Sequence, residues 1–181
     1  MKKYVALLRG INVGGKNIIP MNDLKLLFEK LKFKEVQTYI QSGNVIFESD
    51  ETDTLILSRK IAIGIQKNFN LNVKAFILSC KDLFNVIKSN PFSGKAESDK
   101  YIHVFFLDKK VVNVEIEKLK LAKKHTEEFI LKDKLFYLYA PEGIGRSKLA
   151  ARVERVLRVS VTARNWRSIN EIAKLIVRVT D

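Results

Sequence analysis

The stretch that decides the fold is Tyr4-Val5-Ala6-Leu7-Leu8-Arg9-Gly10-Ile11-Asn12-Val13-Gly14-Gly15-Lys16-Asn17. Residues 3–9 carry apolar side chains on both faces of an extended chain, which predicts a buried strand. The glycines that follow predict a loop. Leucine and phenylalanine then recur at helical spacing over residues 21–31, so the order is strand, glycine-rich loop, helix.

The loop is close in sequence to a nucleotide-binding P-loop, but two features argue against one. The pattern G-x-x-x-x-G-K-[ST] is met at Gly10, Gly15 and Lys16, whereas Asn17 stands where the magnesium-binding hydroxyl belongs. A P-loop also opens directly into its helix, so that phosphate meets the N–H groups of the first turn. Pro20 would interrupt a helix that began there. We therefore predict no working P-loop.

The first half continues with two short strands, a helix and a strand. These are Glu35–Ile40 and Asn44–Glu48 around the turn Gln41-Ser42-Gly43, then residues 53–69 and Val73–Leu78. The resulting order, βαββαβ, is that of a ferredoxin-like unit. A further helix at 80–89 opens with Ser79 and Asp82 in a capping-box arrangement.

The second half repeats this order after a break. The periodic pattern is interrupted by Asn90-Pro91-Phe92-Ser93-Gly94 and by polar residues up to 100, which predicts a boundary. The expected elements are strand Tyr101–Leu107, helix 112–124, strands Glu128–Leu131 and Leu135–Tyr139, helix 147–158, strand Ser160–Ala163 and helix 166–178. The sequence therefore predicts an α+β fold of two ferredoxin-like halves, residues 1–90 and 91–181, with antiparallel sheets and extra helices at the end of each half.

The unusual bulk property is a formal net charge of +13, from 33 Lys and Arg against 20 Asp and Glu. Such a charge favours anionic partners by long-range steering. No apolar run approaches the ~20 residues of a membrane span, so no membrane partner is expected. The chain enters a strand at once without a signal-peptide pattern. With Cys80 as the single cysteine, a reducing cytoplasm fits best; the sequence does not specify the oligomeric state.

Arginine is concentrated late in the chain, where seven of the nine arginines follow residue 145. The rigid guanidinium fork suits phosphate or carboxylate better than lysine does. The helix at 147–158 places Lys148, Arg152 and Arg155 on one stripe, and Arg146 lies in the glycine-rich loop before it. These four side chains are candidate phosphate ligands. The alternatives are an ordinary solvated helix face and a plain loop in which Ser147 caps the helix.

Aromatic side chains alternate in the strands predicted at 101–107 and 135–139. If these strands are neighbours in the sheet, one helix-free face carries Tyr101, His103, Phe105, Tyr137 and Tyr139. Exposed there, Tyr137, Tyr139 and His103 are candidates for stacking on bases, as in RNA-recognition domains. The alternative is that the open faces of the two halves pack together and bury the tyrosines.

Five segments carry a resemblance to a known family. They are Leu7-Leu8-Arg9-Gly10-Ile11-Asn12-Val13-Gly14-Gly15-Lys16-Asn17, Pro20-Met21, Thr38-Tyr39-Ile40-Gln41-Ser42-Gly43-Asn44-Val45, Asn90-Pro91-Phe92 and Thr162-Ala163-Arg164-Asn165-Trp166. In these segments the chain resembles the DUF1697 family of bacterial proteins. The resemblance implies a fold and a compartment but no reaction, because the family has no assigned function. It directs attention to a shared polar set: Arg9, Asn12, Gln41, Asn44, Arg164 and Asn165.

The sequence offers little support for catalysis. Cys80 has no histidine nearby in sequence to act as its base, and His103 and His125 lack metal-ligand spacing. No catalytic residue, metal or cofactor is predicted, and whether the protein is an enzyme stays open. The preferred hypothesis is non-catalytic binding of an anionic ligand, foremost nucleic acid, through the basic residues of 146–155. The loop from Arg9 to Lys16 would be a second contact.

Two alternatives of other classes stay open. One is a small-molecule enzyme or binding protein with a nucleotide-like or carboxylate ligand, held by Arg9, Asn12, Gln41, Asn44 and Arg164. That reading requires these side chains to converge in one pocket. The other is a protein-protein interaction module that uses the tyrosine face, which requires that face to be exposed.

Overall fold

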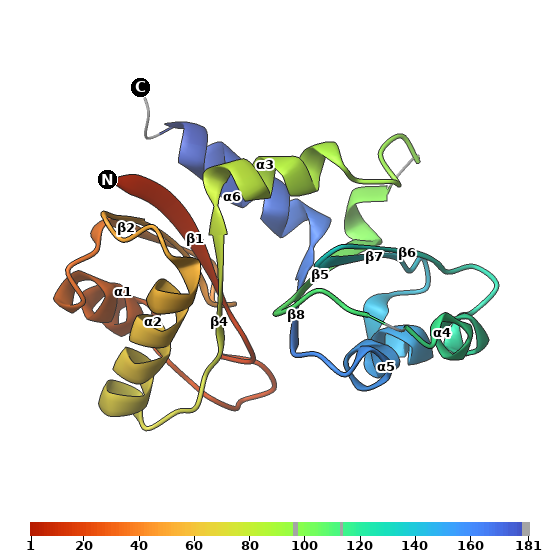
Figure 1. Cartoon of the computed structure of the whole chain (residues 1–181), viewed down its shortest axis with the longest axis horizontal. Helices are drawn as coiled ribbons and strands as arrows, with labels where there is room; N and C mark the ends of the chain where they lie inside the picture. The colour runs from red at the N-terminus through yellow and green to blue at the C-terminus, as the bar shows by residue number, and fades with distance from the viewer. Residues whose placement is uncertain (96–97, 113, 179–181) are drawn as a thin grey trace. The chain divides into compact units, whose positions relative to one another are not determined.

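The computed structural model describes residues 1–95, 98–112 and 114–178. It is an α+β structure with two four-stranded antiparallel sheets (Figure 1). The chain divides into two compact units, one formed by Met1–Asn85 with the segment from Ile172 onward, the other by Val86–Glu171. The sequence boundary between residues 90 and 91 stays a prediction. Residues 96, 97, 113 and 179–181 of the predicted second half lie outside the described ranges.

The first unit has the element order βαββαβ. Its elements are β1 (Lys2–Leu8), α1 (Met21–Lys30), β2 (Lys34–Tyr39), β3 (Asn44–Ser49), α2 (Thr54–Phe69) and β4 (Ala75–Ser79), followed by α3 (Cys80–Lys88). The strand order β2-β3-β1-β4 puts β1 inside the sheet between β3 and β4, and Figure 1 shows α1 and α2 on the same face. The predicted ferredoxin-like topology of the first half is confirmed.

The helix ends follow the signals in the sequence. The carboxylate of Asp53 accepts a backbone N–H of the first turn of α2 at 2.7 Å, and Asn70 ends that helix in the left-handed conformation. Ser79 and Asp82 open α3 with reciprocal hydrogen bonds of 3.1 and 3.2 Å. These bonds confirm the predicted capping box.

The core of the first unit lies between its sheet and its helices. Tyr4, Ala6 and Leu8 alternate along β1 and are buried in one cluster with Phe28 of α1 and Phe47 of β3. The ring centres of Phe28 and Phe47 are 5.5 Å apart in an edge-on arrangement, which is favourable for aromatic pairs. The intervening residues of β1 are also buried, as predicted for a strand inside the sheet.

A close contact joins two loops at one end of this sheet. Gly43 has a φ of +71°, and a Cβ added there would lie 2.7 Å from Cγ1 of Ile11 and 2.9 Å from Cβ of Leu8. The N–H of Leu8 donates to the carbonyl of Gly43 at 2.8 Å. Glycine is therefore needed here for its conformation and for its size.

The second unit repeats the topology of the first. Its elements are η1 (Ser98–Lys100), β5 (Ile102–Leu107), α4 (Ile116–Ala122), β6 (Glu128–Lys132), β7 (Leu135–Tyr139), η2 (Ile144–Arg146), α5 (Lys148–Leu157) and β8 (Val161–Asn165), followed by α6 (Trp166–Arg178). The strand order β6-β7-β5-β8 is again ferredoxin-like. The helix predicted at 112–124 is observed over the shorter range Ile116–Ala122.

The register of the second sheet corrects the predicted aromatic face. Val104 pairs with Tyr137 and Phe105 pairs with Phe136, so Tyr137 and Phe105 point to opposite faces. The rings of Phe105 and Phe136, 5.6 Å apart, lie in the core formed with α4 and α5. His103 shares the face of Phe105, because side chains alternate along a strand. The prediction that His103 and Phe105 share one face with the tyrosines of β7 is wrong.

We expect Gly43→Ala to destabilise the first unit by roughly 2–4 kcal/mol, because left-handed backbone and overpacking both add a cost. Gly14→Ala is the matched control: φ there is +57°, but nothing lies within 4 Å of an added Cβ. Its cost should be about 1 kcal/mol. Urea unfolding followed by circular dichroism measures both variants, and equal losses would contradict the close packing of Gly43.

Candidate functional site

The glycine-rich loop between β1 and α1 is shaped by two asparagines. Oδ1 of Asn12 accepts the N–H of Ile19 at 2.8 Å, and Nδ2 donates to the carbonyl of Ile19 at 3.0 Å. Nδ2 of Asn17 donates to the carbonyl of Gly10 at 2.9 Å. Ile19 is buried, so these bonds anchor the loop to the core of the unit. The amide of Asn12 therefore has a structural role.

The tip of this loop is a tight turn that differs from a P-loop. The N–H of Lys16 donates to the carbonyl of Val13 at 3.1 Å, across Gly14 and Gly15 with φ of +57° and +72°. The side chain of Lys16 is exposed. Helix α1 begins only at Met21, so the lysine does not stand at the first turn of a helix, where a P-loop lysine would.

The polar residues of the first unit gather at one end of its sheet. Arg9 follows β1 and Gln41 lies in the turn between β2 and β3, and both side chains are exposed. Asn44 is fully buried, and its Nδ2 donates to a backbone carbonyl at 3.2 Å and to the hydroxyl of Ser42 at 2.8 Å. With Asn12 they surround the end of β1. The two amides, however, bond to their own loops.

Arg164 belongs to the second unit. It lies in β8, is 8% exposed, and donates from Nη1 to Oγ1 of Thr162 and to the carbonyl of Ala163, both at 2.8 Å. Burial lowers the pKa of Arg164 to about 10, which still leaves it protonated at neutral pH. Oδ1 of Asn165 accepts the N–H of Ser168 at 2.8 Å, so Asn165 caps α6, as its position in the sequence indicates.

The arginines of α5 line a groove in the second unit. Ser147 caps this helix, with its Oγ accepting the N–H of Ala150 at 2.9 Å. The groove between α5 and α4 is lined by Glu115, Lys118, Leu121, Arg152, Arg155, Val156 and Arg158. An adjoining groove shares Glu115, Val156 and Arg158 and adds, among others, Lys109 and Lys110. Together they are called the basic groove.

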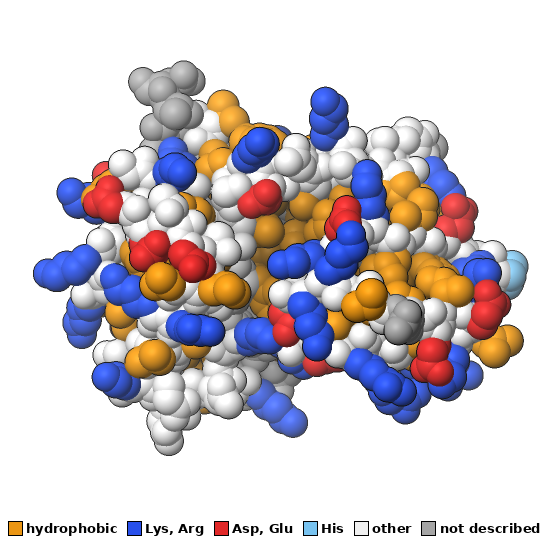
Figure 2. Space-filling model, in the orientation of Figure 1, with side chains coloured by type: hydrophobic (Ala, Val, Ile, Leu, Met, Phe, Trp, Pro, Cys, Tyr) orange, Lys and Arg blue, Asp and Glu red, His pale blue; other side chains and the backbone are white. Residues whose placement is uncertain are grey.

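The basic groove carries a large excess of positive charge. Of the described residues that line it, six are lysine or arginine and one, Glu115, is acidic. Nζ of Lys118 lies 2.6 Å from Oε1 of Glu115, and this hydrogen bond lowers the pKa of Glu115, with the charge of Arg158 adding to the effect. Figure 2 shows lysine and arginine side chains gathered at the lower right, where Figure 1 draws α4 and α5.

The sequence pattern identified only part of the basic groove. Arg152 and Arg155 were found from their helical spacing. Lys118 and the lysines at 109 and 110 come from other elements, and Arg158 ends α5 in the left-handed conformation. Arg146 and Lys148 are exposed near the start of α5 and are not among the side chains that line the groove. Their role stays a prediction.

The candidate stacking residues have three different surroundings. Tyr137 is fully buried, its hydroxyl donates to a backbone carbonyl at 2.9 Å, and burial raises its pKa to about 12. His103 lies on the face that packs against α4 and α5, and burial lowers its pKa. Tyr139 is partly exposed, with its ring centre 6.0 Å from that of Phe92 and 6.2 Å from that of Tyr101.

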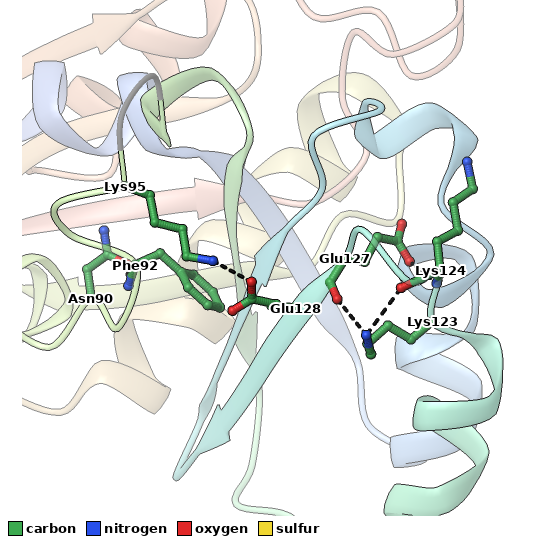
Figure 3. Close-up of polar contacts among 7 residues, drawn as sticks. All are labelled: Asn90, Phe92, Lys95, Lys123, Lys124, Glu127 and Glu128. Carbon is green, nitrogen blue, oxygen red and sulfur yellow. Dashed lines mark hydrogen bonds and ion pairs between the residues drawn. The ribbon is translucent and has the colours of Figure 1, made fainter.

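The segment Asn90-Pro91-Phe92 forms a turn within the second unit. Oδ1 of Asn90 accepts the N–H of Phe92 at 3.0 Å, and both side chains are buried. Figure 3 shows this turn beside Lys95, which forms an ion pair with Glu128 at the start of β6. The turn thus fixes the ring of Phe92 close to a lysine and a carboxylate.

Cys80, the single cysteine, is hydrogen-bonded to the backbone of β1. Sγ of Cys80 donates to the carbonyl of Lys3 at 3.2 Å, and burial raises the pKa of the thiol. A thiol that stays protonated at neutral pH is a poor nucleophile. Within residues 1–95, 98–112 and 114–178, no group of three or more His, Cys, Asp or Glu side chains is placed to hold a metal. No helix of these ranges has the length and apolar content needed to cross a membrane.

The chain belongs to the family described as "Protein of unknown function (DUF1697)", which matches residues 1–137. A similar solved structure is that of the conserved bacterial protein SP0830 from Streptococcus pneumoniae, with a TM-score of 0.71 and 21% sequence identity. The match covers 97% of this chain and 98% of that chain. At this identity the likeness shows the fold alone. No curated protein matches the chain.

The pH dependence of stability checks the placement of His103. Burial lowers the pKa of His103 in the folded state. As the pH falls below ~6.5, the histidine is therefore protonated more readily in the unfolded chain than in the folded one. This preference lowers the free energy of unfolding as the pH falls. We expect the free energy of unfolding to decrease from pH 7.5 to 5.5, and to decrease less in His103→Gln. His125→Gln, at the exposed second histidine, is the control and should keep the wild-type dependence. If His103→Gln also kept the wild-type pH dependence, the placement of His103 in a buried position would be wrong.

Proposed function

We propose that this chain is a cytosolic, non-catalytic binding protein whose ligand is nucleic acid, held through its phosphates. The observation that carries the proposal is the basic groove of the second unit. There Arg152 and Arg155 of α5, with Arg158 directly after the helix, line the groove together with Lys118 of α4, and a single carboxylate, Glu115, does not balance them. An open surface of this charge favours a polyanion over a small neutral ligand.

Phosphate suits this groove better than carboxylate does. A guanidinium fork binds two phosphate oxygens at once, and phosphates recur at regular intervals along a nucleic acid, so that neighbouring cations can each find one. The described lining contains no aromatic side chain. Contacts there would reach the backbone rather than the bases, so we expect binding with little sequence preference and a steep dependence on salt.

The glycine-rich loop of the first unit is a second phosphate contact in this proposal. Arg9 and Lys16 are exposed on it, and the amides of Asn12 and Asn17 hold its shape. A loop that is already ordered loses little conformational entropy when it binds. The backbone of Arg9 also pairs with that of Lys74 at 3.0 Å, which adds an exposed lysine to the same end of the sheet.

The small-molecule reading has less support from the same residues. It requires the amides of Asn12 and Asn44 to face a substrate, whereas both bond to their own loops. Turning them toward a ligand would leave the N–H and carbonyl of Ile19 unpaired next to the core, which is costly. The polar set is better explained as the framework of two loops.

Removing two arginines from the groove tests the proposal. We expect Arg152→Ala, Arg155→Ala to weaken binding of a labelled DNA duplex and a labelled single-stranded RNA, because two phosphate contacts are lost. For the duplex, the slope of log K against log salt should fall by about two. Fluorescence anisotropy at several salt concentrations measures both affinity and slope.

The matched control is Arg59→Ala, Lys67→Ala, which removes the same charge from two exposed positions of α2. Its binding should stay close to wild type. If the two double variants lose affinity equally, the effect is one of net charge and the groove has no special role. Absence of binding by the wild type at low salt would end the nucleic-acid proposal.

A further inference from the structure

An aromatic cluster on the second unit lies outside the basic groove. It consists of Phe92, Tyr101 and Tyr139, with the ring of Tyr139 6.0 Å from that of Phe92 and 6.2 Å, edge-on, from that of Tyr101. Phe92 is buried, whereas Tyr101 and Tyr139 are partly exposed. The rings of Tyr101 and Tyr139 are therefore accessible to a ligand, and the buried ring of Phe92 packs beside Tyr139.

The local structure holds these rings in place. Phe92 is fixed by the turn in which Oδ1 of Asn90 accepts its N–H. Figure 3 shows the side chains of Asn90 and Phe92 in that turn. Tyr139 lies in β7 opposite Ile102 of β5, and the carbonyl of Tyr101 accepts the N–H of Ala140 at 2.9 Å. Tyr139 thus lies in a paired strand and Tyr101 directly precedes one, so the positions of these rings are set before any ligand arrives.

Two lysines cover the exposed ring surfaces. Nζ of Lys95 lies 4.6 Å from the ring centre of Tyr139 and 5.5 Å from that of Phe92, while Nζ of Lys100 lies 4.8 Å from the ring centre of Tyr101. Lys95 also pairs with Glu128 (Figure 3). Rings flanked by lysines combine a stacking surface with cations for phosphate, which is the composition of sites for single-stranded nucleic acid.

We propose that Tyr101 and Tyr139 form a platform for the unpaired bases of single-stranded nucleic acid, with Lys95 and Lys100 as ligands of the adjoining phosphates. This proposal rests on the proposed function and adds a preference for single strands. Stacking of a base on a partly exposed tyrosine contributes more binding free energy than the contact of a lysine with the same ring, so a base can displace the lysine. The flexible lysine stems let both cations move from the rings to the phosphates of the same strand.

Glu128 distinguishes this platform from a site for organic cations. The negative charge of Glu128 repels the phosphates of a bound strand. Its carboxylate also competes with those phosphates for the ammonium group of Lys95. Glu128→Gln should therefore tighten binding of single-stranded nucleic acid, because it removes the repulsion and leaves Lys95 for phosphate. For a ligand such as tetramethylammonium, the same substitution should weaken binding, because a ring site for cations depends on the neighbouring negative charge.

The experiment compares a labelled 12-nucleotide oligothymidylate with an abasic 12-mer that carries the same phosphates. We expect the wild type to bind the oligomer with bases more tightly, and the double variant Tyr101→Leu, Tyr139→Leu to weaken that binding by about tenfold. The abasic oligomer should bind both proteins equally. Tyr39→Leu, at a partly exposed tyrosine of β2, is the control and should bind like the wild type. Circular dichroism establishes that each variant is folded.

The outcomes separate this proposal from the proposed function. If both oligomers bind and the tyrosine variant changes neither, the platform is wrong while the basic groove stands. If neither oligomer binds, thymidine monophosphate at millimolar concentration is titrated against the wild type by NMR, with the ring protons of Tyr101 and Tyr139 observed. Shifts of those protons would support the platform without the groove, and their absence would overturn it.

Discussion

The register of β5 against β7 is the constraint on which the surfaces of the second unit depend. Because side chains alternate along a strand, a slip of one residue would exchange the core for the surface. With Phe105 opposite Phe136, the two rings lie in the core beside α4 and α5. The residues next to them in each strand therefore point to the opposite face of the sheet. Tyr139 then stands opposite Ile102 on one side and opposite Glu128 on the other. Core packing thus decides which ring and which carboxylate are available to a ligand.

In the first unit the corresponding constraint acts on the loops at one end of the sheet. A turn that contains Gly43 presses against Ile11 and Leu8, and Asn12 binds both backbone groups of Ile19. Ile11 and Ile19 are buried, so the loop that carries Arg9 and Lys16 is an extension of the core rather than a free segment. The buried side chains of Ile11 and Ile19 hold the backbone that carries Arg9 and Lys16. This explains how a loop rich in glycine and asparagine can keep one conformation.

The sequence predicted elements and topology well because these depend on local patterns, such as the capping box of Ser79 and Asp82. It did not predict the faces of the second sheet. The strands at 102–107 and 135–139 carry apolar side chains on both faces, so alternation alone cannot fix their register, and His103 was assigned to the wrong side. Helical spacing was sufficient to find the arginines of α5. Lys118 and Arg158 could not be found in this way, because their place in the groove depends on how α4 packs against α5.

The lysines and arginines of the second unit differ in how much binding free energy each could contribute to a phosphate ligand. Lys118 and Lys120 of α4 pair with glutamates three residues earlier, at 2.6 and 2.7 Å. Each such exposed pair contributes only about 0–1 kcal/mol, so a phosphate can compete for the lysine, but it must first displace a carboxylate. Arginine, with a fork that binds two oxygens at once, gains more from each phosphate. The arginines of α5 would therefore supply most of the local binding free energy, while the paired lysines chiefly maintain the positive field that draws a polyanion toward the groove.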